Sequence, residues 1–319
     1  MDHKSEILDF KTPPKPTVSY SPVVFTVPGR QVELQLKVSA PASGNNLPII
    51  LLSHGHGSSN FLSSLKGYGP LVDFYAANGF VVIQPTHQSS KSLGLSPTEH
   101  EGDLFWRSRA EDMHFILDHL DQIEAIVPGL QGRLDKGSIV AVGHSLGGHT
   151  VGLLAGMHIT DPQNGKEINF KAARIKAAVL MGAPGDGKDL AKPAAERFPI
   201  LRHNNFAEMT TPTLVVVGDK DQSPIFSDRN DWRSDAYLLS NGPKCLLTIF
   251  GGEHMLGGIS GYDAGETTDE SPEKVALIQK LTLAYLRSAL YPEDSSWEDA
   301  KKVIREGNDP KEGIECKGY

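Results

Sequence analysis

The sequence has no long apolar run, few cysteines and no excess of basic residues. Each of these features excludes a class of protein. No stretch approaches the roughly 18 consecutive apolar residues that a membrane-spanning helix needs. The 31 Lys and Arg residues are outnumbered by 39 Asp and Glu residues, and a formal net charge of -8 offers no electrostatic footprint for nucleic acid. We therefore expect a soluble protein with neither a membrane span nor a nucleic-acid partner.

The two cysteines, Cys245 and Cys316, are too few for a disulfide-rich scaffold or a cysteine-based zinc cluster. The sequence favours two free thiols, with Cys245 buried in a strand, and leaves a single disulfide open.

The N-terminal residues, MDHKSEILDF, carry charges where a secretory signal needs an apolar core of about 7 to 15 residues. The expected location is therefore cytoplasmic by default. A secreted location would apply if a signal segment had been removed.

The chain has a proline-rich beginning and a charged end. Five prolines within the first 30 residues disfavour a helix and predict an extended lead-in over residues 1–30. Residues 31–290 are expected to form one domain, which opens with an alternating, half-buried strand at residues 32–38. Residues 291–319 read as a charged tail with one short helix around Trp297–Arg305.

Short apolar segments alternate with amphipathic segments through most of the expected domain. This alternation is typical of parallel strands that are covered by helices on both faces. We expect an α/β fold with a mostly parallel central sheet. The predicted strands are residues 49–53, 80–84, 138–142, 175–181, 213–217 and 245–250. The predicted helices are residues 62–78, 104–126, 146–158 and 273–290.

A motif of the form G-x-S-x-G marks a candidate nucleophile. The segment from Gly143 to Gly147 reads GHSLG, directly between a predicted strand and a predicted helix. A sharp turn at such a junction exposes the serine hydroxyl, and residues two positions away must lack a Cβ atom to approach so closely. This placement makes Ser145 the candidate nucleophile.

A serine nucleophile needs a base that accepts its proton and an acid that supports the base. Asp221 follows the predicted strand at 213–217, at the sheet edge where the sites of α/β proteins collect. His254 lies in a glycine-rich loop after the next strand and is the only histidine that follows Asp221. The chain order Ser145, Asp221, His254 is the order described for this type of site. The GDKD sequence at Asp221 would also suit an ordinary turn.

An oxyanion hole needs backbone N–H groups about 3 Å from the developing negative charge. The predicted donors are Leu146, directly after the nucleophile, and His56, in the SHGHG segment after the strand at 49–53. The spacing of His54 and His56 also raises the possibility of a metal site. No third ligand lies at a suitable spacing nearby, so no metal is expected.

The segment GAPGDGK offers a competing interpretation as a phosphate-binding loop. Gly182, Gly187 and Lys188 match the G-x-x-x-x-G-K pattern after a predicted strand. Asp189, however, places a negative charge where the motif needs a Ser or Thr hydroxyl for magnesium. Nucleotide binding is therefore disfavoured.

The segments GHSLGG, SHGHG, PTLVVVGDKD and GGEHMLGG together resemble the α/β-hydrolase superfamily over roughly residues 30–290. Within it, the chain is similar to the esterase branch of dienelactone-hydrolase-like proteins, platelet-activating-factor acetylhydrolases and cutinase-like bacterial polyester hydrolases. The resemblance implies Ser145, Asp221 and His254 as a catalytic triad, with His56 and Leu146 as oxyanion donors. Polyester hydrolases typically have Tyr or Phe where this chain has His56, which argues against an aromatic clamp for polymers. The short segment between two predicted strands, residues 182–212, implies that no large cap domain is present.

The resemblance implies a serine esterase that cleaves carboxylic esters through an acyl-enzyme, without a metal or an organic cofactor. The expected substrate is a small-molecule or lipid-like ester, and Phe61, Trp106, Pro224 and Ile225 are candidate pocket residues. A lipase, a polyester hydrolase or a thioesterase would use the same triad. A non-catalytic, ligand-binding member of the fold is a more distant alternative. The acyl and alcohol specificity and the oligomeric state stay open.

Overall fold

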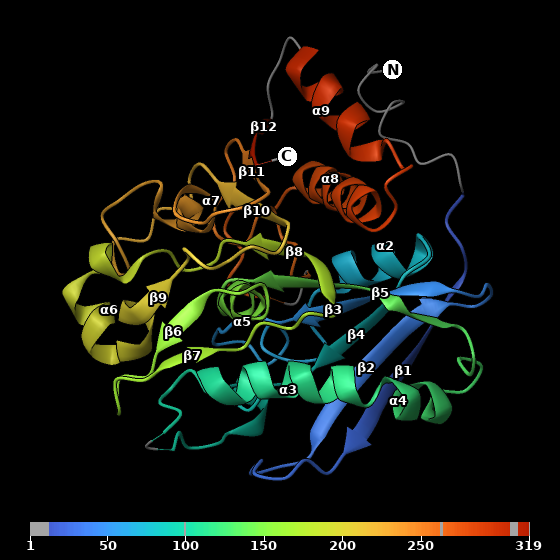
Figure 1. Cartoon of the computed structure of the whole chain (residues 1–319), viewed down its shortest axis with the longest axis horizontal. Coiled ribbons are helices and arrows are strands. Elements are labelled where there is room, and N and C mark those ends of the chain that lie inside the picture. Colours follow the sequence, from blue (N-terminus) through green and yellow to red (C-terminus); the bar gives the residue numbers. More distant parts are fainter. Residues whose placement is uncertain (1–12, 99, 262–263, 307–311, 319) are drawn as a thin grey trace.

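A mixed sheet that is parallel in its middle runs through the centre of the structure (Figure 1). The computed structural model describes residues 13–98, 100–261, 264–306 and 312–318. Across the sheet these residues form β1 (Thr17–Phe25), β2 (Leu34–Pro41), β4 (Val81–Pro85), β3 (Leu47–Ser53), β5 (Leu134–His144), β8 (Ile175–Met181), β10 (Thr213–Gly218), β11 (Lys244–Ile249) and β12 (Glu312–Lys317). The pairs β1–β2, β2–β4 and β11–β12 are antiparallel, and the other neighbours are parallel. A small second sheet has the order β7 (Glu167–Asn169), β6 (His158–Thr160) and β9 (Asn204–Asn205).

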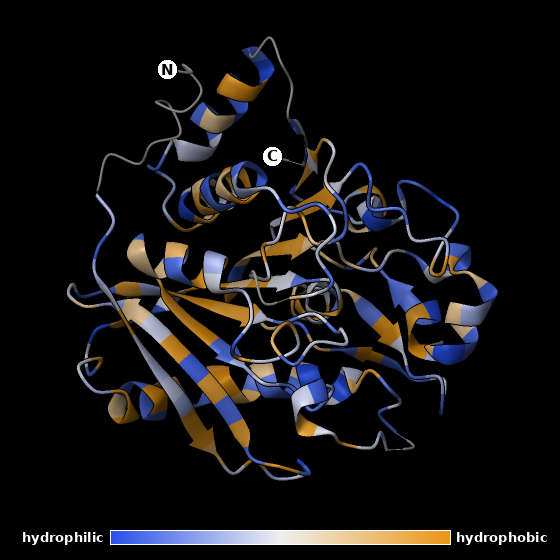
Figure 2. Ribbon diagram, turned by 180° about the vertical axis from the view of Figure 1, so that it is seen from behind, coloured by the Kyte–Doolittle hydropathy of each residue, from blue (hydrophilic) through white to orange (hydrophobic). Residues whose placement is uncertain are grey.

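Helices cover both faces of the large sheet, because each strand in its middle is apolar on both sides. In β3, Ile49 and Leu51 belong to one apolar cluster, whereas Ile50 and Leu52 belong to another. The first cluster includes α3 (Trp106–Asp118), α4 (Leu120–Ile126) and α5 (Leu146–Leu154). The second includes α2 (Gly69–Ala77), α8 (Pro272–Leu290) and α9 (Ser296–Glu306). Figure 2 shows the apolar central strands between these helices. The predicted mostly parallel sheet with helices on both faces is confirmed.

The remaining helices are short. Between β8 and β10 the chain forms η2 (Gly187–Asp189), α6 (Lys192–Arg197), η3 (Pro199–His203) and β9, so no large cap domain interrupts the sheet there. The other short helices are η1 (Lys91–Leu93), η4 (Trp232–Ser234) and α7 (Asp235–Leu238). No helix within the described ranges combines the length and the apolar character that spanning a membrane requires.

Three helices begin or end at other residues than predicted, because of the local backbone conformation. The helix expected at 62–78 begins only at Gly69, because Tyr68 adopts a left-handed conformation with φ of 63° and Pro70 occupies the first turn. The helix expected at 104–126 divides into α3 and α4 at His119, which has φ of -114° and ψ of 20°. The helix expected at 146–158 ends at Leu154, shortly before Gly156, whose φ is 104°.

The two edge strands of the large sheet come from outside the predicted domain, residues 31–290. β1 lies in the predicted lead-in, where a register shift between Tyr20 and Val23 accompanies Pro22. Of that lead-in, residues 1–12 lie outside the described residues. β12 lies in the predicted tail and pairs with β11, and α9 contains the predicted helix at Trp297–Arg305. Residues 307–311 and 319 of the tail lie outside the described residues.

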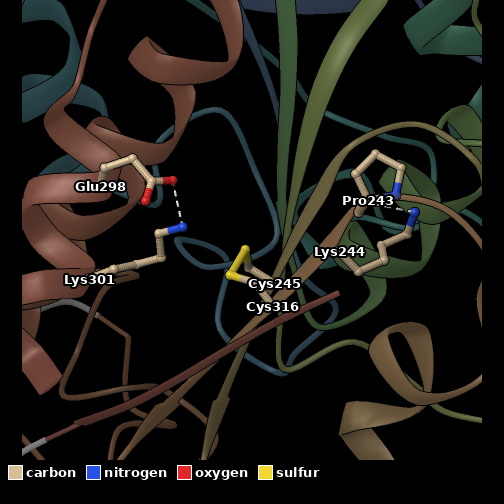
Figure 3. Close-up of a disulfide and its surroundings, with 6 residues drawn as sticks. All are labelled: Pro243, Lys244, Cys245, Glu298, Lys301 and Cys316. Carbon is tan, nitrogen blue, oxygen red and sulfur yellow. Dashed lines mark hydrogen bonds and ion pairs between the residues drawn. A yellow bond between two sulfur atoms is a disulfide. The ribbon is translucent and has the colours of Figure 1, made fainter. Parts of the chain in front are cut away.

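Cys245 and Cys316 form a disulfide between β11 and β12 (Figure 3). They are directly opposite each other in the antiparallel pair. The favoured expectation of two free thiols was wrong. Its error has a physical reason: the segment EGIECK has too little apolar alternation to be recognised as a strand, so nothing in the sequence placed Cys316 beside Cys245.

Removal of this disulfide should weaken the fold without touching Ser145, Asp221 or His254. For Cys316→Ser we expect the free energy of unfolding to fall by about 2–4 kcal/mol, because the bond closes a long loop of the unfolded chain. Urea unfolding monitored by circular dichroism measures the change. Wild-type protein unfolded in the presence of a reductant is the control and should match the variant. Equal stability of oxidised wild type and variant would contradict the prediction.

Candidate active site

Ser145 occupies a tight turn between β5 and α5, with φ of 54° and ψ of -122°. A non-glycine residue rarely adopts a positive φ, and here the surrounding glycines permit it. A Cβ atom built on Gly143 would lie 2.2 Å from the Gly147 carbonyl oxygen, and one on Gly147 would lie 2.0 Å from the Ser53 carbonyl oxygen. The turn therefore forms only with glycine at both positions, and it lifts the Ser145 hydroxyl to the carboxyl end of the parallel strands.

The structure brings the three residues of the predicted triad together. His254, in the loop after β11, places its Nε2 atom 3.0 Å from the Ser145 Oγ atom. Its Nδ1 atom lies 2.8 Å from Asp221 Oδ2, in the loop after β10. This line of hydrogen bonds is the arrangement in which a histidine can remove the serine proton while a carboxylate fixes its orientation.

Two opposite charges act on His254. Arg233 is buried, with its Nε atom 2.8 Å from Asp221 Oδ2 and its Nη1 group donating to the Gly182 carbonyl at 2.7 Å. Burial and then the Arg233 guanidinium lower the pKa of His254 below its ordinary value, although the hydrogen bond to Asp221 acts in the opposite direction. Burial would raise the pKa of Asp221, but the hydrogen bond with His254 and the charge of Arg233 outweigh it and lower that pKa. A neutral imidazole beside an ionised carboxylate follows.

The two predicted oxyanion donors lie next to this triad. Leu146 is the first residue of α5, so its N–H group precedes the first hydrogen bond of the helix. His56 follows β3, and its N–H group donates to no described residue. Both residues line the cavity at Ser145. Burial, followed by the charge of Arg109, lowers the pKa of His56 to about 4, so its imidazole is neutral near pH 7.

A buried arginine that the sequence analysis missed fixes the start of the loop that carries the predicted donor His56. We call residues 54–59 the oxyanion loop, after this predicted role. Arg109 in α3 is fully buried, and its Nη2 group donates to the His54 carbonyl. The guanidinium also donates to Thr150 Oγ1 at 2.9 Å, Ser89 Oγ at 2.7 Å and Ser53 Oγ at 3.2 Å. One side chain therefore connects β3, α3 and α5 directly behind the loop. No sequence signal separates it from an ordinary surface arginine of an amphipathic helix.

The first histidine of the H-x-H segment, His54, packs in the interior and contacts the backbone through its ring. His54 accepts a hydrogen bond from the backbone N–H of His87 at its Nε2 atom, and its Nδ1 atom lies 2.7 Å from the Gly55 carbonyl. Burial and then the charge of Arg109 lower the pKa of His54 well below the ordinary value. Both ring nitrogens of His54 are thus occupied by the backbone and are not presented to a metal ion.

The GAPGDGK segment is likewise packed against protein. A Cβ atom on Gly187 would lie 2.3 Å from Arg202 Cα, and the N–H group of Asp186 donates to Asp235 Oδ2 at 2.8 Å. The helix that follows, η2, has only three residues. The segment therefore lacks the open ring of backbone N–H groups and the long helix of a phosphate-binding loop.

A cavity of about 370 Å³ opens at Ser145, a size that suits a small organic ligand. Much of its wall is apolar and comes from α5, from the segment between β8 and β10, and from the loop after β10. Phe198, Phe226 and Trp232 are stacked there, with neighbouring ring centroids 6.1 Å and 6.3 Å apart. The apolar lining residues are Leu104, Leu146, Pro184, Phe198, Leu201, Phe226 and Trp232.

The four residues that the sequence suggested for the substrate pocket do not line the cavity at Ser145. Phe61 lines a second cavity, and Trp106 is buried at the start of α3 against Phe170. Pro224 and Ile225 lie in the loop after β10, where Ile225 is 73% exposed, but neither forms part of the cavity wall. Ser223 and Phe226, the direct neighbours of these two residues, do line the cavity.

Comparison with known families agrees with this geometry. The model of the alpha/beta hydrolase family matches residues 49–278. The chain belongs to the alpha/beta hydrolase family. The matched segment of this hydrolase includes the oxyanion loop, Ser145, Asp221 and His254, and it confirms the predicted fold. A comparison with curated proteins finds no match. The narrower resemblance to an esterase branch stays a prediction.

The glycine at position 147 should be indispensable to the hydrolase. In Gly147→Ala the new Cβ atom would meet backbone atoms of β3, which cannot move without disturbing the sheet. We expect a loss of about 3 kcal/mol or more of stability, since overpacking against backbone is relieved poorly. Thermal unfolding of the purified protein measures it.

Gly265→Ala is the matched control, because a Cβ atom there meets nothing within 4 Å. A Gly147→Ala protein as stable as the control would refute the steric argument.

Proposed function

We propose that this hydrolase cleaves carboxylic esters through an acyl-enzyme intermediate on Ser145. The observation that carries the proposal is the unbroken hydrogen-bonded line from Ser145 Oγ through His254 to Asp221, in the wall of a cavity that is apolar on one part of its surface. His254 removes the Ser145 proton as the hydroxyl attacks the ester carbonyl, and the N–H groups of His56 and Leu146 stabilise the resulting oxyanion. Protonated His254 then delivers its proton to the leaving alcohol.

In the second half of the reaction, His254 takes a proton from a water molecule as that water attacks the acyl-enzyme, and it returns the proton to Ser145 Oγ as the acid is released. The proposed steps use these side chains, the two backbone N–H groups and water. The apolar wall around Phe198, Phe226 and Trp232 supports a small or lipid-like ester as the substrate. The similarity to the esterase branch supports the same reading. Comparison of oxygen esters with matched thioesters separates the esterase from a thioesterase.

Labelling with a fluorophosphonate tests the nucleophile directly. Such reagents react quickly only with an activated serine, so the intact mass of wild-type protein should increase by one adduct. Ser145→Ala should show no adduct and should lose ester hydrolysis by a factor of about 10⁴ or more. Ser223→Ala is the control, because Ser223 lines the same cavity and should leave labelling intact. An unlabelled wild-type protein would favour a binding-only member of the fold.

The pH dependence of kcat/KM tests the electrostatics of His254. The reaction needs neutral His254, so the rate should fall as the pH drops through the pKa of this residue. Because that pKa is lowered, the midpoint should lie below the ordinary histidine value of about 6.5. In Arg233→Met the pKa should rise, since a positive charge that opposes protonation is lost, and the acid limb should move to higher pH.

Arg229→Met is the control, because it also removes an arginine that pairs with a buried aspartate close to the site. Arg229 pairs with Asp235 rather than with Asp221, so its removal should leave the acid limb in place. An unchanged limb in Arg233→Met would show that Arg233 does not tune His254.

A further inference from the structure

The catalytic histidine and the oxyanion loop are connected behind the active site by two buried side chains. His144, the residue before Ser145, places its Nε2 atom 2.8 Å from the His254 carbonyl oxygen. Its Nδ1 atom lies 2.8 Å from the Tyr68 hydroxyl. The same hydroxyl accepts a hydrogen bond from the Gly55 N–H group at 3.0 Å. A chain of hydrogen bonds thus runs from the residue before His56 to the backbone of His254.

Only one arrangement of protons satisfies this chain. The His254 carbonyl can only accept, so His144 must carry its proton on Nε2. Burial lowers the pKa of His144 to about 3, so the ring is neutral and its Nδ1 atom accepts. The Tyr68 hydroxyl must then donate to that atom while it accepts from Gly55. Burial raises the pKa of Tyr68, which keeps its proton in place.

The backbone around Tyr68 is built for this contact. Tyr68 is fully buried and holds a positive φ of 63°, which is rare for an aromatic residue. Its own N–H group donates to the Ser260 carbonyl at 2.8 Å, in the segment that follows His254. A Cβ atom on Gly55 would lie 2.9 Å from the Tyr68 hydroxyl oxygen. Strain at Tyr68 and glycine at position 55 both serve to bring the hydroxyl against the oxyanion loop.

We propose that Tyr68 and His144 are positioning residues that hold the oxyanion loop in register with the catalytic His254. The inference rests on the proposed esterase function and deepens it. Neither side chain touches the substrate cavity. A second tie between the same segments, from the Ser59 N–H group to Glu266 at 2.8 Å, lies nearer to solvent. The buried chain is shielded from water and therefore constrains geometry more strongly.

The role predicts a specific kinetic signature. The oxyanion and the protonated His254 exist only in the transition state and the intermediates, so loss of their alignment should lower kcat and leave KM nearly unchanged. A residue with a merely structural role would lower stability instead.

Tyr68→Phe removes one hydroxyl and keeps the ring. We expect kcat to fall about 10- to 100-fold on a soluble aryl ester, with a similar fall in the rate of fluorophosphonate labelling. Tyr75→Phe is the matched control, because Tyr75 lies in α2, the helix that follows Tyr68, is fully buried, and hydrogen-bonds Thr282 Oγ1 at 2.7 Å, away from both loops. It should lose comparable stability and stay within about twofold of wild-type kcat. Equal kcat for the two variants would overturn the proposal.

A double-mutant cycle with His144→Phe tests whether the two residues act as one unit. If they do, His144→Phe alone lowers kcat, and adding Tyr68→Phe to it costs little more. Strictly multiplicative losses would overturn the relay. His144→Phe also serves as the second variant if Tyr68→Phe does not fold.

Nitrogen-15 NMR of the histidine rings keeps this inference separate from the proposed function. The wild-type spectrum should show His144 as the neutral Nε2–H tautomer, whether or not the protein hydrolyses esters. A different tautomer would overturn the relay. A wild-type protein with this tautomer, but with neither labelling nor ester hydrolysis, would refute the proposed function instead.

Discussion

The site depends on one close approach, that of the turn around Ser145 to the end of β3. Because Gly147 has no side chain, α5 begins almost in contact with the Ser53 carbonyl. The same contact places Ser145, the proposed nucleophile, beside the oxyanion loop, which begins at the residue after β3. Parallel neighbours in the sheet end at the same edge, so the loops after β10 and β11 deliver Asp221 and His254 to the same place. The two glycines thus fix Ser145 beside the end of β3, and the common edge of the parallel strands brings the other two residues of the proposed triad to it.

Apolar packing positions the strands, but it does not fix loops whose backbone groups need partners. Buried polar side chains do that here. Arg109 binds the carbonyl that precedes the oxyanion loop, and the Tyr68–His144 pair connects that loop to His254. Each buried polar group loses its hydration on folding, so only a fully paired arrangement is stable. That requirement makes these connections rigid, and a rigid active site avoids reorganisation during the reaction.

Sequence analysis predicted the features that local patterns encode. Most strands, the turn at Ser145 and the order of the triad follow from apolar segments that end in glycine or polar residues. It missed what depends on contacts distant in sequence. β12 is weakly apolar and is stabilised by pairing with β11. The sequence therefore contained no indication that Cys316 lies opposite Cys245. The cavity wall depends on how the fold brings Phe198 and Leu201 to Ser145, and Arg109 has the spacing of an ordinary helix residue. Each of these features is set by tertiary packing.

Asp221 and Arg233 together orient His254 and keep its imidazole neutral. A carboxylate beside His254 fixes the ring, but alone it would also favour the protonated ring, which cannot accept the Ser145 proton. Arg233 shares the same oxygen of Asp221 and opposes protonation of His254. Asp221 can therefore orient the base without keeping it protonated. In the proposed reaction, the ionised carboxylate is already in contact with the ring when the proton arrives from Ser145, so its stabilising effect is concentrated in the transition state and the intermediate.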